Sequence, residues 1–560
     1  MYNRNTIIHI NDQIGPGHDH TGPVLDGILS SGIYQQHIYR DIIISPITNH
    51  KKATKDIIDD SYQVLYSSRD NLRKHPYSRN FAEVEEKFGV SIIFGHRNLI
   101  SHDNQTATGD KTHVEFVLID VSEAAPSPVN ALKAWMYDEF GIESNRYEAN
   151  KDYDLYVKLA PAALAVTRAM DACHPDNPAI MISHDVSGMP TILAAVLDPL
   201  ASFKTVLWAH EVPTVSDIIQ QYPGHDTMFC NIMQWAKAND YFLSDVFGPQ
   251  DYSYKHKLFC AARHCDNIIA VSQRVADHIR FLEPQMKYQE IDVAPDGLPC
   301  RIITLHQKLQ CKINAQQFSQ NLLGYCPDHI FTHFANTHTT KGCWRDLRVL
   351  YHLEQIFAKQ HKTAVLFIIG TENCDSQFRT CIQQFNDRNH KIKILYINQR
   401  NYATDSLDTL DIKIASDLEF GQSIYEPFGL AQLQALSFGS LCIPTNVCGC
   451  LELINKIFNG TLPANVISAN YTALCGQTLG KNSLLHLNQN QRDNIEEAIS
   501  INIAGQIAKK LPTDHQQLQK LLDIGHKIIE YANWDNIIEK HHLKAIRHTL
   551  IKQRNIRQIA

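Results

Sequence analysis

The chain has 560 residues, of which 44% are hydrophobic and 20% are charged, and its formal net charge is −7 at pH 7. This length predicts roughly two to four domains rather than one core. The negative charge, and the lack of a long basic run, argue against nucleic acid and anionic membranes as main partners.

The cysteines and the apolar runs predict the compartment. Fourteen Cys are scattered along the chain without a C-x-x-C pair, which is typical of reduced thiols rather than of a zinc site or a disulfide framework. The N-terminus has no apolar run long enough for a signal peptide, and no stretch of about 18 apolar residues occurs. We therefore expect a cytoplasmic protein without a transmembrane segment.

Short β-branched runs alternate with longer amphipathic stretches. In the first half they predict strands at 5–10, 41–47, 90–94, 114–120, 179–183, 204–208, 267–271 and 290–293. In the second half they predict strands at 330–335, 364–369, 392–397, 417–420 and 440–444. This alternation is typical of an α/β fold, in which helices cover both faces of a parallel sheet.

The segment 294–300, APDGLPC, predicts a hinge because it holds two prolines and a glycine. We therefore predict an N-terminal domain over 1–298 and a C-terminal domain over 299–530. The polar, Asn/Gln-rich segment 470–500 predicts a surface loop, and 531–560 predicts a helical tail.

The stretch SIYEPFGLAQLQALSFGS (423–440) carries the strongest chemical signal. Its apolar spacing predicts a buried helix that begins near Phe428 or Gly429, and Pro427 suits a helix entrance. The N–H groups of such a helix end attract phosphate. Glu426 beside it would accept hydrogen bonds from hydroxyls, and a sugar diphosphate offers both groups. The same residues also fit the start of an ordinary core helix.

This stretch resembles the donor-site segment of retaining GT-B glycosyltransferases, above all the glycogen and starch synthases, whose segment reads E-P-C-G-L-x-Q-L-x-A-x-x-x-G. Phe428 replaces their Cys. Other segments resemble the family in the same order: SHDVSG (183–188), LWAHEVP (207–213), IIAVSQRVADHI (268–279), VAPDGL (293–298), TTKGCWRDL (339–347) and YANWDNII (531–538).

The resemblance implies GT-B architecture, with two Rossmann-like domains facing across a cleft. The N-terminal domain would bind the acceptor, the C-terminal domain would bind the donor, and the tail would pack back on the N-terminal domain. It also implies transfer of a hexose, with glucose favoured, from a UDP- or ADP-sugar to a glycan or other acceptor. Configuration would be retained, without a bound metal or a cofactor.

The resemblance also implies residue roles. Glu426 would bind the donor sugar hydroxyls, Lys341 would pair with the diphosphate, and His210 and His184 would approach the donor sugar. The diphosphate would be held by backbone N–H groups of Phe428, Gly429 and Leu430. The remaining candidates are Gln434, Asn336, Arg345 and Gly449 for the donor, and Gly15, Gly17 and Asp185 in the acceptor domain.

Two positions depart from the family pattern. Asn336 stands where the family has an Arg five residues before the Lys, and Arg345 or His338 could substitute for it. Gln434 stands where many relatives carry a second Glu. Because one leaving-group contact is worth about 2–4 kcal/mol, a catalytically weak or inactive protein that binds a nucleotide sugar or glycan is an alternative. A third reading is another GT-B-shaped enzyme, such as a sugar-nucleotide epimerase or a phosphorylase.

Overall fold

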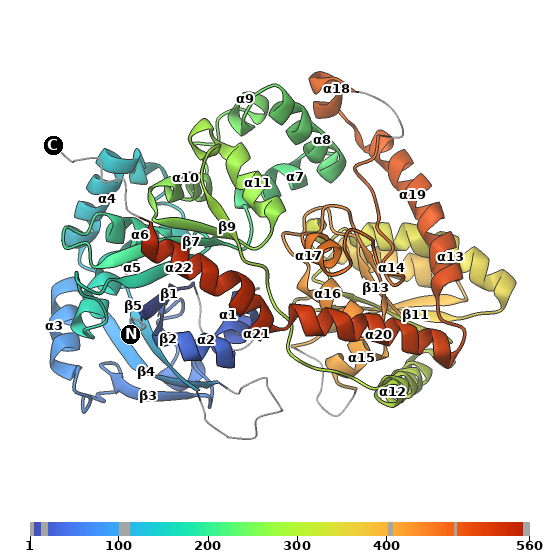
Figure 1. Cartoon of the computed structure of the whole chain (residues 1–560), viewed down its shortest axis with the longest axis horizontal. Helices are drawn as coiled ribbons and strands as arrows, with labels where there is room; N and C mark the ends of the chain where they lie inside the picture. The colour runs from blue at the N-terminus through green and yellow to red at the C-terminus, as the bar shows by residue number, and fades with distance from the viewer. Residues whose placement is uncertain (1–4, 13–20, 100–111, 401–406, 475–478, 553–560) are drawn as a thin grey trace. The chain divides into compact units, whose positions relative to one another are not determined.

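The computed structural model describes residues 5–12, 21–99, 112–400, 407–474 and 479–552. The chain divides into two compact units (Figure 1). Unit 1 comprises Met1–Thr214, Phe242–Pro299 and Trp534–Ala560, and unit 2 comprises Val215–Tyr241 and Cys300–Asn533. Both units are α/β, as predicted.

Unit 1 is built on a nine-stranded sheet in the order β3-β4-β5-β2-β1-β6-β7-β8-β9. Its strands are β1 (Asn5–Ile10), β2 (Ile38–Pro46), β3 (Tyr62–Ser67), β4 (Ser91–Leu99), β5 (Thr112–Asp120), β6 (Ala179–His184), β7 (Phe203–Ala209), β8 (Asn267–Ala270) and β9 (Ile291–Val293). The pairs β3–β4 and β4–β5 are antiparallel, and the other pairs are parallel. We did not predict β3, which contains a single β-branched residue, Val64.

The helices of unit 1 lie between these strands and at the end of the chain. They are α1 (Thr21–Leu29), α2 (Gly32–His37), α3 (Ser78–Phe88), α4 (Pro126–Phe140), α5 (Lys151–Ala169), α6 (Met189–Val196), α9 (Leu243–Phe247), α10 (Tyr254–Cys260), α11 (Gln273–Leu282), α21 (Trp534–Ile537) and α22 (Leu543–Ile551). Short turns η1 (Thr54–Asp56), η2 (Ser144–Arg146), η3 (Ala261–His264), η4 (Pro284–Met286) and η6 (Ile538–His542) connect some of them.

Trp534 fixes the last helices in unit 1. A Cβ atom on Gly27 or Gly297 would lie 2.1 or 2.7 Å from its ring, so both positions need glycine. Ile538 and Ile546 join the same buried cluster as Ile7 of β1. The C-terminal segment is therefore part of the unit 1 core.

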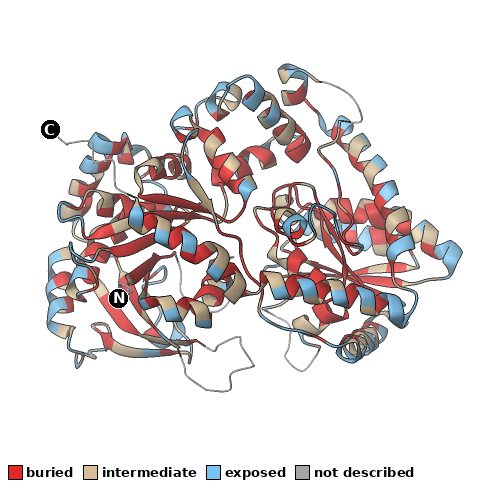
Figure 2. Ribbon diagram, in the orientation of Figure 1, coloured by how far each residue is buried: buried red, intermediate tan, exposed pale blue. Residues whose placement is uncertain are grey.

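Unit 2 is built on a five-stranded parallel sheet in the order β12-β11-β10-β13-β14. Its strands are β10 (His329–Phe334), β11 (Ala364–Gly370), β12 (Ile392–Asn398), β13 (Leu418–Gly421) and β14 (Leu441–Pro444), each at a predicted position. Its helices are α8 (His225–Ala238), α12 (Leu305–Leu323), α13 (Cys343–Gln360), α14 (Ser376–Arg388), α15 (Thr409–Ala415), α16 (Leu430–Ser437), α17 (Cys450–Ile457), α18 (Lys481–Leu485), α19 (Gln489–Lys510) and α20 (His515–Ala532), with the turn η5 (Thr339–Lys341). Helix α7 (Pro213–Gln221) enters unit 2 from unit 1. The strands are buried, whereas the helices expose their outer faces (Figure 2).

Two segments differ from our predictions. Residues 215–241 belong to unit 2, although we placed them in the N-terminal domain. They are tied there because Asp226 pairs with Arg345 at 2.6 Å and the Thr227 hydroxyl donates to the Tyr471 carbonyl at 2.7 Å. The predicted surface loop at 470–500 contains α18 and the start of α19, whose buried Glu496 contacts Arg345.

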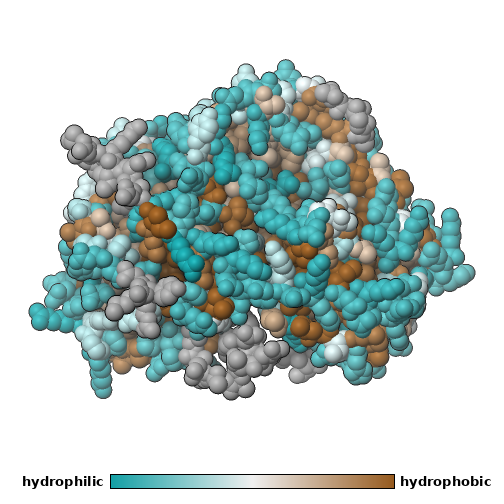
Figure 3. All heavy atoms as spheres, viewed as in Figure 1, coloured by the Kyte–Doolittle hydropathy of each residue, from teal (hydrophilic) through white to brown (hydrophobic). Residues whose placement is uncertain are grey.

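Hydrophilic residues predominate on the face drawn in Figure 3, and hydrophobic ones form separate patches there. Among the described residues, no helix is both long and apolar enough to cross a bilayer.

Candidate active site

The loop after β13 leads into α16 through Gly429. This residue has φ +98° and is the N-terminal cap of the helix. A Cβ atom here would lie 2.4 Å from the Cys448 Sγ and 2.9 Å from the Gln432 Oε1. Both the backbone angle and the space therefore require glycine. The helix begins at Leu430, next to the predicted start, and its first N–H groups have no acceptor within the helix.

Glu426 and Lys341 meet beside this helix end. The Lys341 Nζ lies 2.9 Å from the Glu426 Oε2, and the Ser423 hydroxyl donates to the same oxygen at 2.9 Å. Glu426 is 9% exposed, so its carboxylate is held in place but remains reachable. The structure thus brings together the two residues predicted to contact the sugar and the diphosphate.

Gly342 explains why the lysine is followed by a glycine. Its φ is +62°, and a Cβ atom there would lie 2.2 Å from the Gln422 carbonyl oxygen. The Lys341 turn can therefore lie directly against the loop after β13, where the Ile424 N–H donates to the Thr340 carbonyl at 2.8 Å. This close approach places the ammonium group at Glu426.

The Cys448–Cys450 segment supports the same loop from behind. The Gly449 N–H donates to the Glu426 carbonyl at 3.1 Å, and the Cys448 Sγ lies 3.2 Å from the Phe428 carbonyl oxygen. The two sulfur atoms are 3.4 Å apart. The hydrogen bond with Cys448, together with burial, raises the pKa of the Cys450 thiol well above its ordinary value. These residues therefore act as packing and backbone support, not as nucleophiles.

Arg345 does not replace the missing arginine. Its side chain is fully buried; its Nε donates to the Glu496 Oε1 at 2.8 Å, and its Nη2 donates to the Asp226 Oδ1 at 2.6 Å. The Tyr471 ring lies 4.0 Å from the guanidinium. These contacts bind the helices of unit 2 to one another and leave Arg345 no open face for a phosphate.

Asn336 and Gln434 also hold the fold. The Asn336 Oδ1 accepts from the Thr371 and Glu372 N–H groups at 2.8 and 3.2 Å, which ties the ends of β10 and β11 together. The Gln434 Oε1 accepts from the Lys413 Nζ at 2.8 Å. Burial lowers the pKa of Lys413 to about 8. His338, the other candidate substitute, is exposed and lies 3.0 Å from Glu372.

A polar network that we did not predict lies beneath the Glu426 loop. The Gln422 Nε2 donates to the Asp346 Oδ1 at 2.8 Å, and the Tyr471 hydroxyl donates to the Gln422 Oε1 at 2.5 Å. Asp346 also pairs with the buried His333 at 2.6 Å, and it raises the pKa of that imidazole although burial alone would lower it. This network fixes the backbone that presents Glu426.

In unit 1 three histidines form a chain at the strand ends. The His184 Nε2 lies 3.0 Å from the His9 Nδ1, and the His184 Nδ1 lies 2.9 Å from the His210 Nε2. The Tyr34 hydroxyl continues the chain, 3.5 Å from the His9 Nε2, and donates to Asp41 at 2.9 Å. The family resemblance pointed to His184 and His210 but not to His9, which reads as a core position in an apolar strand.

His184 is the neutral middle member of this chain. Burial, with the adjacent His210 and His9, lowers the pKa of His184 well below its ordinary value, so its ring is neutral at pH 7. A neutral imidazole donates through one nitrogen and accepts through the other. The tautomer of His184 therefore decides which of its two neighbours receives a hydrogen bond and which donates one.

Asp185 orients the end of this chain. It has φ +54°, and its Oδ1 accepts from the N–H groups of His210 and Glu211 at 2.7 and 3.2 Å. Burial and the Glu211 carboxylate raise the pKa of Asp185 well above its ordinary value. Its role is to hold the backbone of His210. Gly15 and Gly17 lie outside the described residues.

Two groups of described residues have donor atoms close enough to hold a metal ion: His256, Cys260 and Glu283, and His333, Cys343 and Asp346. In the second group, burial alone would lower the pKa of His333, but the Asp346 carboxylate raises it. Neither group includes Glu426 or Lys341.

The part of unit 2 that carries the Glu426 site is similar to a known protein family. Residues 336–473 match the family described as Glycosyl transferases group 1. All of the matched residues lie in unit 2. A search of curated proteins returned no match.

Solved structures show the same fold over nearly the whole chain. The catalytic domain of starch synthase IV from Arabidopsis thaliana, bound to ADP and acarbose, is 14% identical with a TM-score of 0.53, covering 98% of this chain and 99% of that one. Sucrose-phosphate synthase from Thermosynechococcus elongatus is 11% identical with a TM-score of 0.52, covering 98% and 100%. An E. coli trehalose-6-phosphate structure bound with UDP-2-fluoro glucose is 10% identical with a TM-score of 0.51, covering 98% and 99%. The predicted GT-B fold and the resemblance to GT-B glycosyltransferases are confirmed.

Proposed function

We propose that the protein is a retaining hexosyltransferase that moves a hexose, with glucose favoured, from a UDP- or ADP-sugar to a glycan or other acceptor. The observation that carries this proposal is the Lys341–Glu426 pair at the glycine-capped start of α16. It offers one cation and free N–H groups for a diphosphate, and one carboxylate for sugar hydroxyls. The ADP and UDP-2-fluoro glucose named for two structural neighbours support the choice of donor.

The reaction would use these groups as charge develops. The bond from the sugar C1 to the diphosphate breaks, and negative charge grows on the leaving oxygen. Lys341 and the N–H groups of Gly429 and Leu430 would stabilise that charge. The acceptor oxygen bonds to C1 on the same face, and its proton passes to the departing phosphate. The products are a glycoside and a nucleoside diphosphate.

His210 is the unit 1 residue that we propose contacts the substrate. It follows the carboxyl end of β7, the edge at which ligands bind in open α/β sheets. The chain through His184 and His9 would set its tautomer. Asp185, which holds the His210 backbone, would act on the same side of the reaction.

A donor screen tests the function. Purified full-length protein would be incubated with UDP-, ADP- and GDP-hexoses, with thermal shift reporting binding and nucleotide release reporting turnover. We expect one donor to stabilise the chain, and Glu426→Gln and Lys341→Ala each to slow turnover by about 10²–10³-fold. Lys359→Ala, an exposed lysine on α13, is the matched control. Turnover unchanged in both site variants would refute the proposal.

The second candidate is a protein that binds a nucleotide sugar or glycan without efficient turnover. The enclosure of Arg345 and the structural role of Asn336 favour it, because neither supplies the second cation of the family pattern. A donor that stabilises the chain without nucleotide release, in the presence of glycan acceptors, would support this candidate over the first.

A further inference from the structure

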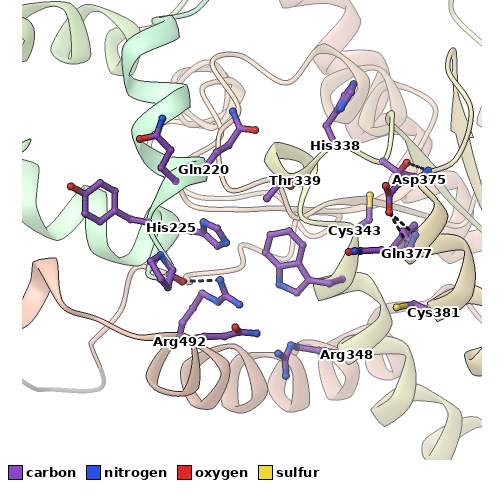
Figure 4. A pocket seen from close by; sticks show the side chains of 17 residues that line it. Gln220, His225, His338, Thr339, Cys343, Arg348, Asp375, Gln377, Cys381 and Arg492 are labelled. Atoms are coloured by element: carbon purple, nitrogen blue, oxygen red, sulfur yellow. Dashed lines mark hydrogen bonds between the residues drawn. The ribbon is translucent and has the colours of Figure 1, made fainter. Parts of the chain in front are cut away.

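A cavity of about 560 Å³ opens in unit 2. Its walls come from the α7–α8 turn, the loop after β10, and the starts of α13, α14 and α19, and Figure 4 shows Gln220, His225 and Arg492 reaching toward it. Neither Lys341 nor Glu426 lines it. Its size lies within the range of about 300–1,000 Å³ typical of small-molecule sites.

Trp344 gives this cavity a fixed aromatic wall. The indole Nε1 donates to the Glu496 Oε2 at 3.0 Å, which sets the orientation of the ring. The His225 ring lies 5.6 Å from it, and the Arg492 guanidinium lies 5.7 Å from it. The side chain is half-buried, so part of it faces the cavity. A fixed, partly open indole in a polar setting suits a ligand with one apolar face.

The two arginines that line the cavity are already paired. Arg348 pairs with Asp493 at 2.7 Å and with Glu496 at 3.4 Å. Arg492 donates to the Pro223 carbonyl at 2.8 Å and to Asp493 at 3.1 Å. A phosphate would have to compete with these carboxylates and would be repelled by them. The cavity therefore favours a neutral ligand.

The remaining polar groups suit hydroxyls. The His225 Nδ1 donates to the Ile219 carbonyl at 2.7 Å, and burial lowers the pKa of the ring, so its Nε2 is an acceptor. Gln377 and Gln489 line the cavity with exposed amides, each able to donate and to accept. Hydroxyl groups need both kinds of partner.

We propose that this cavity binds a neutral oligosaccharide, with one sugar ring against Trp344 and its hydroxyls bonded to His225 and the glutamine amides. Thr337–Thr339 line the cavity, and Lys341 follows in the same turn. A bound glycan would therefore lie beside the loop that carries the donor-binding lysine. This binding goes beyond the proposed transfer, and it does not require the Glu426 site to turn over.

Calorimetric titration of the full chain tests the site. The probes are maltoheptaose, cellohexaose and laminarihexaose, with glucose 6-phosphate as the anionic comparison. We expect at least one neutral probe to bind and Trp344→Ala to weaken it at least tenfold, whereas Trp135→Ala, an exposed tryptophan in unit 1, leaves it unchanged. Gln377→Ala should weaken binding about threefold, the worth of one hydrogen bond. The Gln377→Ala variant also keeps the test decisive if Trp344→Ala does not fold.

Three results would overturn the proposal. They are the absence of binding by every neutral probe at millimolar concentration, equal affinity of wild type and both variants, and tighter binding of glucose 6-phosphate than of any neutral probe at low salt. Nucleotide release from the same preparations reports the Glu426 site separately. A failure of the glycan site and a failure of the transferase function would therefore be told apart.

Discussion

Gly429→Ala is the substitution whose cost the structure defines best. The residue has φ +98°, and the added methyl carbon would lie 2.4 Å from the Cys448 Sγ. Two penalties act together. A left-handed backbone costs a residue with a Cβ about 1–2 kcal/mol, and overpacking a closed site costs about 1–3 kcal/mol. We therefore expect a loss of roughly 2–5 kcal/mol in the free energy of unfolding of unit 2.

Two further variants separate these penalties. Gly460 has φ +82°, and a Cβ atom there meets no heavy atom within 4 Å, so Gly460→Ala carries the backbone cost alone. In the double variant Gly429→Ala with Cys448→Ala, the clashing sulfur is gone. The double variant should therefore be more stable than the sum of the single effects predicts, with a coupling of about 1–3 kcal/mol.

Urea unfolding followed by circular dichroism measures these differences, and donor affinity by thermal shift reports the site. Gly429→Ala should also weaken donor binding, because relief of the clash moves the first N–H groups of α16. Gly460→Ala should leave binding unchanged. If Gly429→Ala and Gly460→Ala destabilise equally, and the double variant shows no coupling, the close-contact reasoning is wrong.

Three other changes test separate features. Arg345→Met leaves the buried Asp226 carboxylate without its cation and removes one of the cations beside Glu496, so the urea midpoint should fall by the equivalent of about 3–5 kcal/mol. Burial lowers the pKa of His542 to about 4, below its unfolded value of about 6.5, so the stability of the wild type should decline as the pH falls through this window. Urea midpoints measured at pH 7 and at pH 5 should therefore differ less in His542→Gln than in the wild type. Asn336→Arg supplies the cation of the family pattern, so nucleotide release should become faster. It also removes the Asn336 contact at the end of β11, so the urea midpoint should fall. A slower nucleotide release would contradict the argument that a cation is missing.

The alternation of β-branched runs predicted the strands because a parallel sheet buries both faces and leaves apolar runs in the sequence. The prediction failed at β3, where Val64 is the single β-branched residue. This strand lies at the antiparallel edge of the sheet, where fewer β-branched apolar residues are needed than in a buried parallel strand. It also failed at the start of α19, whose polar surface hides the buried Glu496. Polarity on one helix face does not reveal what the other face contacts.

In the candidate site, too, some residues could be predicted from the sequence and others could not. Glu426 and Gly429 could be predicted because each has a local chemical reason to occupy its position, whereas Lys341 was predicted from the family resemblance. The partners of Arg345 could not, since Asp226 is 119 residues away in sequence and a buried ion pair has no period or spacing. In the sequence, Arg345 lies close to Lys341 and looked available for a phosphate. Only the packing in the structure shows that its side chain is enclosed.

The pairing of Lys341 with Glu426 also bears on how a donor would bind. The ammonium group that would hold the diphosphate lies 2.9 Å from the carboxylate that would hold the sugar. A donor must therefore share or replace this ion pair. The sugar hydroxyls would donate to Glu426 in place of Lys341, and the diphosphate would accept from Lys341 in place of Glu426. Asn336 and Arg345 contribute no second cation, so the α16 N–H groups would carry a larger share of the charge than in the family pattern. Donor affinity should consequently depend weakly on salt and strongly on the geometry at Gly429.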